Sequence, residues 1–309
     1  MRLLVLTHSL DDPSFRLRWG QLFPMLEGEG IECSAAAIPA RGKGSVLAQA
    51  ADADVTVHHR RLLARRDYAV LRRAAKRLIY DIDDALCYRP LAPHRSRQRE
   101  RRFFRAVGGA DAVFAGNRVL AGITRVANRR VMVVPTTLLP DHYGYEGPKL
   151  ERFTAVWIGQ RSTVPLLDPI LPSLRDAGIP LRVIADTAPD GTEFFPWSLE
   201  AEARALGEAH VGVMPIPNNP IARGKCGFKL LQYFAAGLPA VASPVGVNRS
   251  LAAGGALLAR APSEWVAALT TLRDDAELRD RMGSAAHAFV ARRYNAEHLA
   301  QRVARLLKT

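Results

Sequence analysis

The feature that most constrains this chain is a basic, glycine-containing segment leading straight into an amphipathic helix pattern. Arg223 and Lys225 precede Gly227, and Lys229 opens the helical pattern. Unpaired amide groups and the positive end of the dipole at a helix start attract an anion, and glycine lets that ligand approach the backbone. One such lysine alone is typical of an ordinary surface connector, but the whole run favours a site for a phosphorylated ligand.

The residues after this segment predict loop, helix, tight turn and strand in that order. Large apolar residues recur at helical spacing over 229–236, so one face of this helix would lie in a core. Lys229 and Gln232 would then be free to reach a ligand. Gly237 ends the helix, Pro239 blocks its continuation, and residues 240–243 are predicted to form a short buried strand.

Short β-rich runs alternate with helical patterns, which is typical of parallel sheets covered by helices on both faces. The strands expected in the first half are Leu3–Thr7, Ile31–Ile38, Asp54–Val57, Leu78–Ile82, Ala112–Ala115 and Val131–Val134. Those of the second half are Phe153–Ile158, Leu181–Ala185, Val211–Met214 and Ala240–Ser243, after a proline-rich linker over 135–152. We therefore predict an α/β protein with two Rossmann-like, doubly wound domains, 1–140 and 141–309, and an active site in the interdomain cleft.

The basic segment resembles the nucleotide-sugar-binding motif of GT-B glycosyltransferases of the family-four, or group 1, type. In that motif a Lys, and an acidic or amide residue three positions on, precede a small-residue helix that ends in Gly-x-Pro-Val-Val-Ala-Ser. Segments elsewhere also look like this family: Val211–Pro217, Ile79–Ala85, Ala115–Asn117 and Val134–Thr137. The resemblance implies a metal-independent, retaining glycosyltransferase, with a nucleotide-diphosphate sugar as donor and a last helix that packs back on the N-terminal domain.

The turn that follows the first strand of the second half is a second donor-side candidate. It places backbone amides, two hydroxyls and the Arg161 guanidinium at a strand end, where Ser162 or Thr163 could equally be a simple helix cap. The resemblance implies that this turn faces the donor diphosphate, with Arg161 and Lys229 as the catalytic cations. The donor-binding residues are then Gly159, Ser162, Lys225, Cys226, Gly227, Phe228 and Gln232.

These cations suit the chemistry, because breaking a sugar–phosphate bond leaves negative charge on the departing diphosphate, which a fixed positive site stabilises. They could replace a metal ion, so no metal cofactor is expected. The chain also departs from the family pattern. Gln232 stands where relatives often carry a Glu that accepts the ribose hydroxyls, and Gly224 where many carry a Glu against the donor sugar. A non-catalytic nucleotide-sugar-binding subunit, or an epimerase or hydrolase on the same fold, is therefore the alternative.

Acidic and histidine side chains follow strands of the first half and point to an acceptor side. Asp81 and Asp83 spell an Asp-x-Asp, but the alternation and the C-terminal motif favour a metal-independent fold. By position Asp83 and Asp84 resemble the family's His-Asp pair. In that role they would orient an acceptor hydroxyl or take its proton. The alternative is that both are ordinary acids, either solvated or capping a helix. His58 and His59 are further candidates. Of Arg16 and Arg18, on different faces of the next helix, we expect Arg16 to reach the acceptor.

The net charge of +13 is concentrated in the first half, in basic blocks over 60–77 and 95–105. Such a face is either merely solvated or binds an anionic membrane surface; nucleic acid is disfavoured because no stacking aromatics are interleaved. A membrane-binding face would suit a lipid-linked or phosphate-bearing acceptor. The glycosyltransferase interpretation as a whole predicts an envelope glycan, a lipid-linked or a secondary-metabolite acceptor. Three cysteines without a Cys-x-x-Cys pair suggest neither disulfides nor zinc. With no signal peptide or membrane span in the pattern, we expect a cytoplasmic protein that can also lie peripherally at the inner face of the membrane.

Overall fold

The chain forms two compact units. The computed structural model describes residues 1–309, except for the side chains of Leu199 and Glu200. Unit 1 consists of Met1–Thr137, Asn219–Cys226 and Ala296–Thr309, and unit 2 of Leu138–Asn218 and Gly227–Asn295. Two segments of the second half therefore have their contacts in unit 1. The expected division at residues 140 and 141 stays a prediction about domain boundaries.

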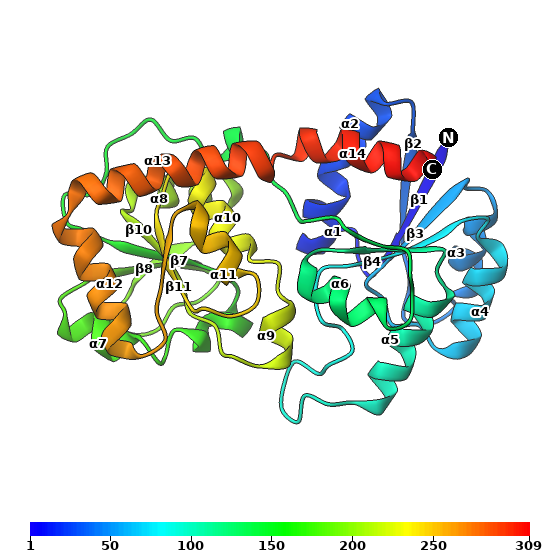
Figure 1. Ribbon diagram of the computed structural model, residues 1–309, viewed down its shortest axis with the longest axis horizontal. Helices are drawn as coiled ribbons and strands as arrows, with labels where there is room; N and C mark the ends of the chain where they lie inside the picture. Colours follow the sequence, from blue (N-terminus) through cyan, green and yellow to red (C-terminus); the bar gives the residue numbers. More distant parts are fainter. The chain divides into compact units, whose positions relative to one another are not determined.

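Unit 1 is built on a parallel six-stranded sheet with the order β2-β1-β3-β4-β5-β6 (Figure 1). Its strands are β1 (Arg2–Thr7), β2 (Glu32–Ala37), β3 (Val55–His59), β4 (Leu78–Ile82), β5 (Ala112–Ala115) and β6 (Val131–Val133). All pairings in this sheet are parallel. The carboxyl ends of the strands therefore meet at one edge, where ligands bind in such sheets.

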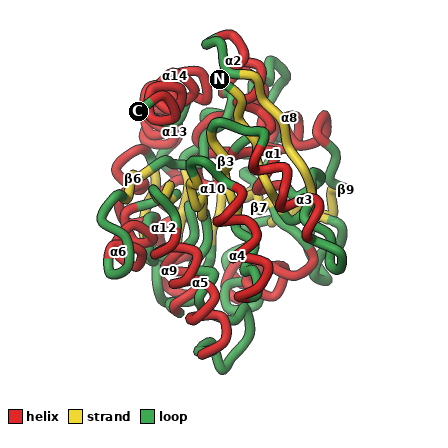
Figure 2. Tube along the Cα trace, turned by 90° about the vertical axis from the view of Figure 1, so that its right-hand side faces the viewer, coloured by secondary structure: helices red, strands yellow, loops and turns green.

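Helices cover both faces of this sheet. One face carries α3 (Gly44–Ala48), α4 (Arg65–Ala74), α5 (Arg97–Gly109) and α6 (Arg118–Arg125), whose apolar residues share a core with β1, β4 and β5. The other carries α1 (Pro13–Arg18), α2 (Phe23–Gly28) and α14 (Ala296–Lys308), and both views show α14 beside α2 (Figures 1 and 2). Helix α9 (Pro220–Gly224) packs on α6.

Unit 2 repeats the plan with a parallel sheet of order β12-β11-β10-β7-β8-β9. Its strands are β7 (Ala155–Ile158), β8 (Leu181–Ala185), β9 (Glu193–Pro196), β10 (Val211–Met214), β11 (Ala240–Ala242) and β12 (Ala256–Leu258). One face packs on α8 (Leu199–Glu208), α10 (Phe228–Ala235) and α13 (Ala276–Arg293). The other packs on α7 (Leu171–Asp176) and α12 (Pro262–Asp274), and a short α11 (Asn248–Leu251) follows β11.

The expected fold class is confirmed, and so is each strand that the sequence predicted. Two edge strands were missed: β9, whose residues are mostly exposed, and β12, which has only three residues. Both lack the buried apolar run by which the other strands were recognised. The break expected near Tyr294 is also confirmed, since α13 ends at Arg293 and α14 begins at Ala296. Among the described residues, no helix combines the length and apolarity needed to cross a bilayer.

Candidate functional site

The helix start singled out by the sequence is α10 in unit 2. Gly227 is its N-cap residue and has a φ of +70°, a left-handed conformation that favours glycine. A side chain there would also meet Leu251, since a Cβ would lie 2.5 Å from its Cδ1. None of the side chains that the structure describes caps this helix start, so its first turn can offer amide groups to an anion.

Tyr233 fixes α10 against the sheet. Its hydroxyl donates to the carbonyl oxygen of Val213 at 3.0 Å and accepts from the amide of Ile158 at 3.3 Å. These two bonds tie the helix to β10 and β7. Its N-terminal turn is therefore held at a constant position relative to the carboxyl end of β7.

Lys229 and Gly159 are brought together at this point. The Lys229 Nζ lies 3.9 Å from the centre of the Trp157 ring, a cation–π geometry that orients the ammonium group. A Cβ on Gly159 would lie 2.8 Å from Nζ and 2.1 Å from the Trp157 ring, so only glycine fits. The two positions that the sequence assigned to the donor diphosphate are thus neighbours within unit 2.

Arg161 and Ser162 lie in the turn after β7 and are exposed. The amide of Arg161 donates to Asp186 Oδ1 at 2.7 Å, and its Nε lies 3.4 Å from Oδ2. Asp186, which follows β8, was missed, although its place straight after a predicted strand could have revealed it. The Arg161 side chain is 73% exposed, so its pairing with Asp186 is easily exchanged for another anion.

Gln232 is buried and pairs with a carboxylate. Its Nε2 donates to Glu202 and, at 3.4 Å, to the hydroxyl of Tyr143. The indole Nε1 of Trp197 donates to the other oxygen of Glu202 at 2.6 Å. Sequence reasoning missed Glu202, because nothing in the pattern distinguishes it from the other acids of α8. The structure thus places a carboxylate beside the amide where the family motif has an acidic residue.

A buried charge network lies at the carboxyl ends of β3 and β4 in unit 1, centred on Asp81. Asp81 accepts hydrogen bonds from Arg18 and, at 2.8 Å each, from Trp19 Nε1 and His59 Nδ1. Burial by itself raises the pKa of Asp81, but the Arg18 charge and the hydrogen bonds from His59 and Arg18 outweigh it and lower the pKa below its usual range. Asp81 is therefore ionised and holds the other members in place.

Ser14 connects His59 to Asp83. Its Oγ donates to Asp83 Oδ2 and lies 3.0 Å from His59 Nε2. A serine hydroxyl has a single proton, so Asp83 and His59 cannot both receive it. Either His59 donates to Ser14 while Ser14 donates to Asp83, or a protonated Asp83 donates to Ser14 while Ser14 donates to His59. The arrangement can therefore pass one proton between Asp83 and His59.

Arg60 holds both predicted acceptor-side acids. Its guanidinium lies 3.1 Å from Asp83 Oδ1 and 3.0 Å from Asp84 Oδ2. Arg60 is also the one non-glycine residue with positive φ (+61°) among those described, a conformation that costs about 1–3 kcal/mol and tends to occur at functional sites. Burial and the neighbouring Asp83 charge raise the pKa of Asp84, against the charges of Lys225 and Arg60.

Lys225 and Cys226, assigned to the donor from the sequence, have their contacts in unit 1. Asn117 Nδ2 donates to the carbonyl oxygens of Gly224 and Lys225 at 2.9 and 3.2 Å. The Cys226 thiol donates to the carbonyl of Asp83 at 3.2 Å, and burial raises the pKa of this thiol to about 12. The structure therefore brings these residues next to the acceptor-side acids, and their donor contacts remain a prediction.

Gly224 fits its surroundings only without a side chain. A Cβ there would lie 2.6 Å from the Cβ of Ala85 and 3.0 Å from its amide nitrogen. The Glu that many relatives carry at this place would displace the backbone next to Asp84.

Of the two arginines on α1, Arg18 joins the Asp81 network, whereas Arg16 is exposed and keeps its acceptor role only as a prediction.

No group of three or more His, Cys, Asp or Glu side chains in the described part of the chain is arranged to hold a metal ion. The two carboxylates of the Asp-x-Asp have separate partners. Asp81 accepts hydrogen bonds from Arg18, Trp19 and His59. Asp83 Oδ2 accepts from Ser14 and Arg60, and Asp83 Oδ1 is paired with Arg60 by charge alone.

Comparison with known proteins supports the resemblance. Residues 170–305 match the model of a family described as glycosyl transferase-like. None of the curated proteins compared matches the chain. Among solved structures, Anabaena HepE in complex with UDP has 14% identity, a TM-score of 0.74 and 100% coverage of both chains. The fold is GT-B.

Two further GT-B structures agree. Sucrose-phosphate synthase from Thermosynechococcus elongatus has a TM-score of 0.76 at 13% identity, covering 100% of this chain and 98% of its own. AviGT4, a glycosyltransferase involved in avilamycin A biosynthesis, has a TM-score of 0.61 at 14% identity, covering 99% and 97%. At these identities the likeness shows the fold, and with the family match it supports glycosyl transfer as the activity.

Proposed function

We propose that this protein transfers a glycosyl group from a nucleotide-diphosphate sugar to an acceptor hydroxyl without a metal ion and with retention of configuration. The observation that carries the proposal is Lys229, held over Trp157 and beside Gly159 at the uncapped start of α10. Ammonium, backbone amides and helix dipole then converge on one anionic group. HepE forms complexes with UDP and UDP-glucose, and α-glucosyltransferase forms one with UDP, so UDP-sugars are the first donors to test.

On the donor side, the bond between the sugar C1 and the diphosphate oxygen breaks, and its electron pair stays on the diphosphate. Lys229 and the α10 amides stabilise the charge that develops there, with Arg161 as an exposed partner that can leave Asp186 for the diphosphate. One hydrogen-bonding or cationic group that stabilises such a developing charge typically contributes about 3–4 kcal/mol of transition-state stabilisation.

On the acceptor side, Asp83 orients the attacking hydroxyl and takes its proton. The oxygen of that hydroxyl forms the new bond to C1 on the face from which the diphosphate departs, as retention requires. The proton passes from Asp83 through Ser14 to His59, where Asp81 stabilises the resulting imidazolium. Arg60 keeps Asp83 and Asp84 in position. A glycan, lipid-linked or small-molecule acceptor fits this scheme, and one presented at the cytoplasmic face of an anionic membrane also suits the net charge of +13.

One observation favours a non-catalytic nucleotide-sugar-binding subunit as the second candidate. Gly224 cannot carry the acidic side chain that many relatives place against the donor sugar. Such a subunit would bind the nucleotide and leave the donor intact.

The test is a screen of UDP- and other nucleotide-diphosphate sugars in buffer with EDTA, with melting temperature and diphosphate release read in parallel. A ligand that binds only the folded state raises the melting temperature. We expect stabilisation by one nucleoside diphosphate without metal, and release of that diphosphate from its sugar when an acceptor mixture is added. Stabilisation without release from any donor would favour the binding subunit, and release without acceptor would favour a hydrolase. No stabilisation by any diphosphate would overturn the proposal.

A further inference from the structure

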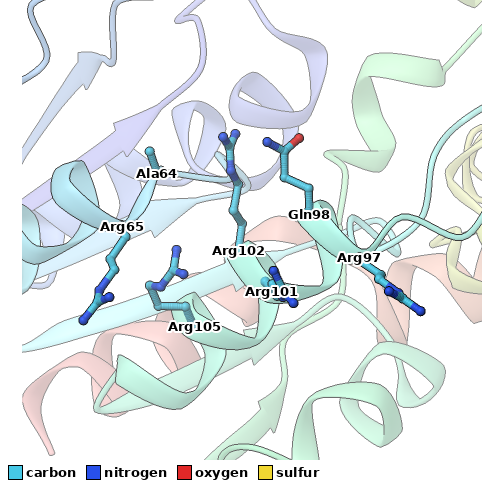
Figure 3. A pocket seen from close by; sticks show the side chains of 7 residues that line it. All are labelled: Ala64, Arg65, Arg97, Gln98, Arg101, Arg102 and Arg105. Carbon is cyan, nitrogen blue, oxygen red and sulfur yellow. The ribbon is translucent and has the colours of Figure 1, made fainter.

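A second basic site lies in unit 1, in a pocket of about 450 Å³ between α4 and α5. Figure 3 shows its side chains, which come from the start of α4 and from residues 97–105 of α5. The polar lining is dominated by arginine: Arg65, Arg97, Arg101, Arg102 and Arg105. Ala64 and Gln98 complete it, so the lining contains no carboxylate and no aromatic ring.

The five arginines have no counter-charge. None of their guanidinium groups makes an ion pair or hydrogen bond with any described residue, whereas Arg72, on the same α4, pairs with Asp111 at 3.1 Å. Arg97, Arg101 and Arg105 also follow one another at intervals of four along α5, where like charges destabilise a helix by a few tenths of a kcal/mol per pair. The protein thus keeps repelling charges around a concave surface, which an anion would relieve.

The start of α4 adds a second, independent anion-binding feature. Its N-cap residue is Ala64, whose side chain cannot accept a hydrogen bond from the first-turn amides. Ala64 itself lines the pocket. The positive end of a ten-residue helix therefore faces the same space as the guanidinium groups.

The arginines differ in orientation. In Figure 3 Arg97 points away from Arg65 of α4 and Arg105 of α5. Arg102 and Arg105 are half-buried, and Arg65, Arg97 and Arg101 are exposed. Arg102 and Arg105 are therefore the two lining arginines that are best shielded from bulk solvent.

We propose that the α4–α5 pocket is a binding site for a phosphate or pyrophosphate group carried by a ligand. Guanidinium forks match phosphate oxygens two at a time, and a volume near 450 Å³ suits a compact headgroup. Without an aromatic ring in the lining, the pocket offers no stacking surface for nucleic-acid bases. The site is lined by unit 1 residues alone and does not depend on the proposed glycosyl transfer.

The test uses the full chain carrying Lys229→Ala, so that binding at the donor lysine does not contribute. Pyrophosphate is titrated by calorimetry, and vesicles of phosphatidylcholine with and without phosphatidic acid are used in parallel sedimentation. The pocket variant is Arg102→Gln/Arg105→Gln. The matched control is Arg66→Gln/Arg73→Gln, which removes the same charge from exposed positions of α4 that do not line the pocket.

We expect the pocket variant to weaken binding of pyrophosphate, of phosphatidic acid vesicles or of both at least tenfold, and the control to change it less than twofold. Weaker binding of pyrophosphate would identify a soluble phosphate as the ligand, and weaker binding of phosphatidic acid vesicles would identify a lipid-borne one. The apo melting temperature of the pocket variant should not fall, because repulsion is removed. Equal weakening by both variants, or no binding of either ligand, would overturn the proposal.

Discussion

Gln232 donates a hydrogen bond to Glu202, and the pair is buried in unit 2. The amide stands where the family motif has a residue that accepts the ribose hydroxyls, and an amide oxygen accepts more weakly than a carboxylate. Glu202 supplies a carboxylate at the same place from another helix. Trp197 and Tyr143 hold this arrangement from two other segments.

Substitution of Glu202 tests whether its carboxylate accepts a hydrogen bond from the ribose of the nucleotide. We expect Glu202→Gln to weaken UDP binding about tenfold, since charged hydrogen bonds contribute about 1.5–3 kcal/mol. The preference for UDP over 2′,3′-dideoxy-UDP should shrink with it, and the swap variant Glu202→Gln/Gln232→Glu should restore that preference. Calorimetry with both nucleotides measures this. A purely structural pair would lower the melting temperature and leave the preference unchanged.

Gly224→Ala should destabilise unit 1. The added Cβ would lie 2.6 Å from the Cβ of Ala85, so the backbone would have to move, at a cost of about 1–3 kcal/mol. Gly122→Ala in α6 is the matched control, because nothing lies within 4 Å of a Cβ there and alanine favours a helix. Urea denaturation reports both free energies of unfolding. Equal stability of the two variants would refute the close fit.

Ser14→Ala should break the path between Asp83 and His59 without touching the donor residues. Turnover is expected to fall at least tenfold, since general base catalysis typically contributes 10²–10⁴-fold. UDP affinity should be unchanged, and Ser14→Thr, which keeps a hydroxyl, should recover much of the rate. Steady-state kinetics over a range of pH values tests this. A Ser14→Ala enzyme with the wild-type rate and pH profile would mean that the network is only structural.

His58 makes stability depend on pH in the acid range. It is fully buried beside Tyr80, with ring centroids 5.0 Å apart, and neither ring nitrogen is hydrogen-bonded to a described residue. Burial lowers its pKa from 6.5 to about 3. Between these values the unfolded chain binds the proton and the folded one does not, so His58 contributes stability above pH 6.5 that is lost as pH falls toward 3.

The expected slope from His58 is up to about 1.4 kcal/mol per pH unit in that window. His58→Leu removes the titrating group and should flatten the pH dependence by this amount. Urea denaturation of both proteins at several pH values between 7.5 and 4.5 gives the comparison. If the free energies of unfolding of wild type and variant changed with pH in parallel, His58 would not be the source of the pH dependence.

The sequence predicts most of the fold because buried strands carry a strong local signal. Leu78–Ile82 and Leu181–Ala185 are apolar runs between helical patterns, and both were placed to the residue. The resemblance assigned Gly159 and Lys229 to the same donor, and the structure shows that the two are neighbours, while their contact with a donor stays a prediction. The pairings that complete each site were not predictable, since Ser14, Asp186 and Glu202 contact residues 25 or more positions away in the chain. Only the position of Asp186 straight after β8 marked it as a candidate. Arg16 was preferred to Arg18 because helical spacing separates the two faces without saying which is buried.

The central claim is that Lys229 stabilises the departing diphosphate. The most direct measurement is the turnover number of Lys229→Ala in EDTA buffer, with Lys76→Ala, an exposed lysine of unit 1, as the control. We predict a loss of a hundredfold or more for Lys229→Ala and a wild-type rate for the control. Near-normal turnover by the purified, folded Lys229→Ala protein would contradict the account.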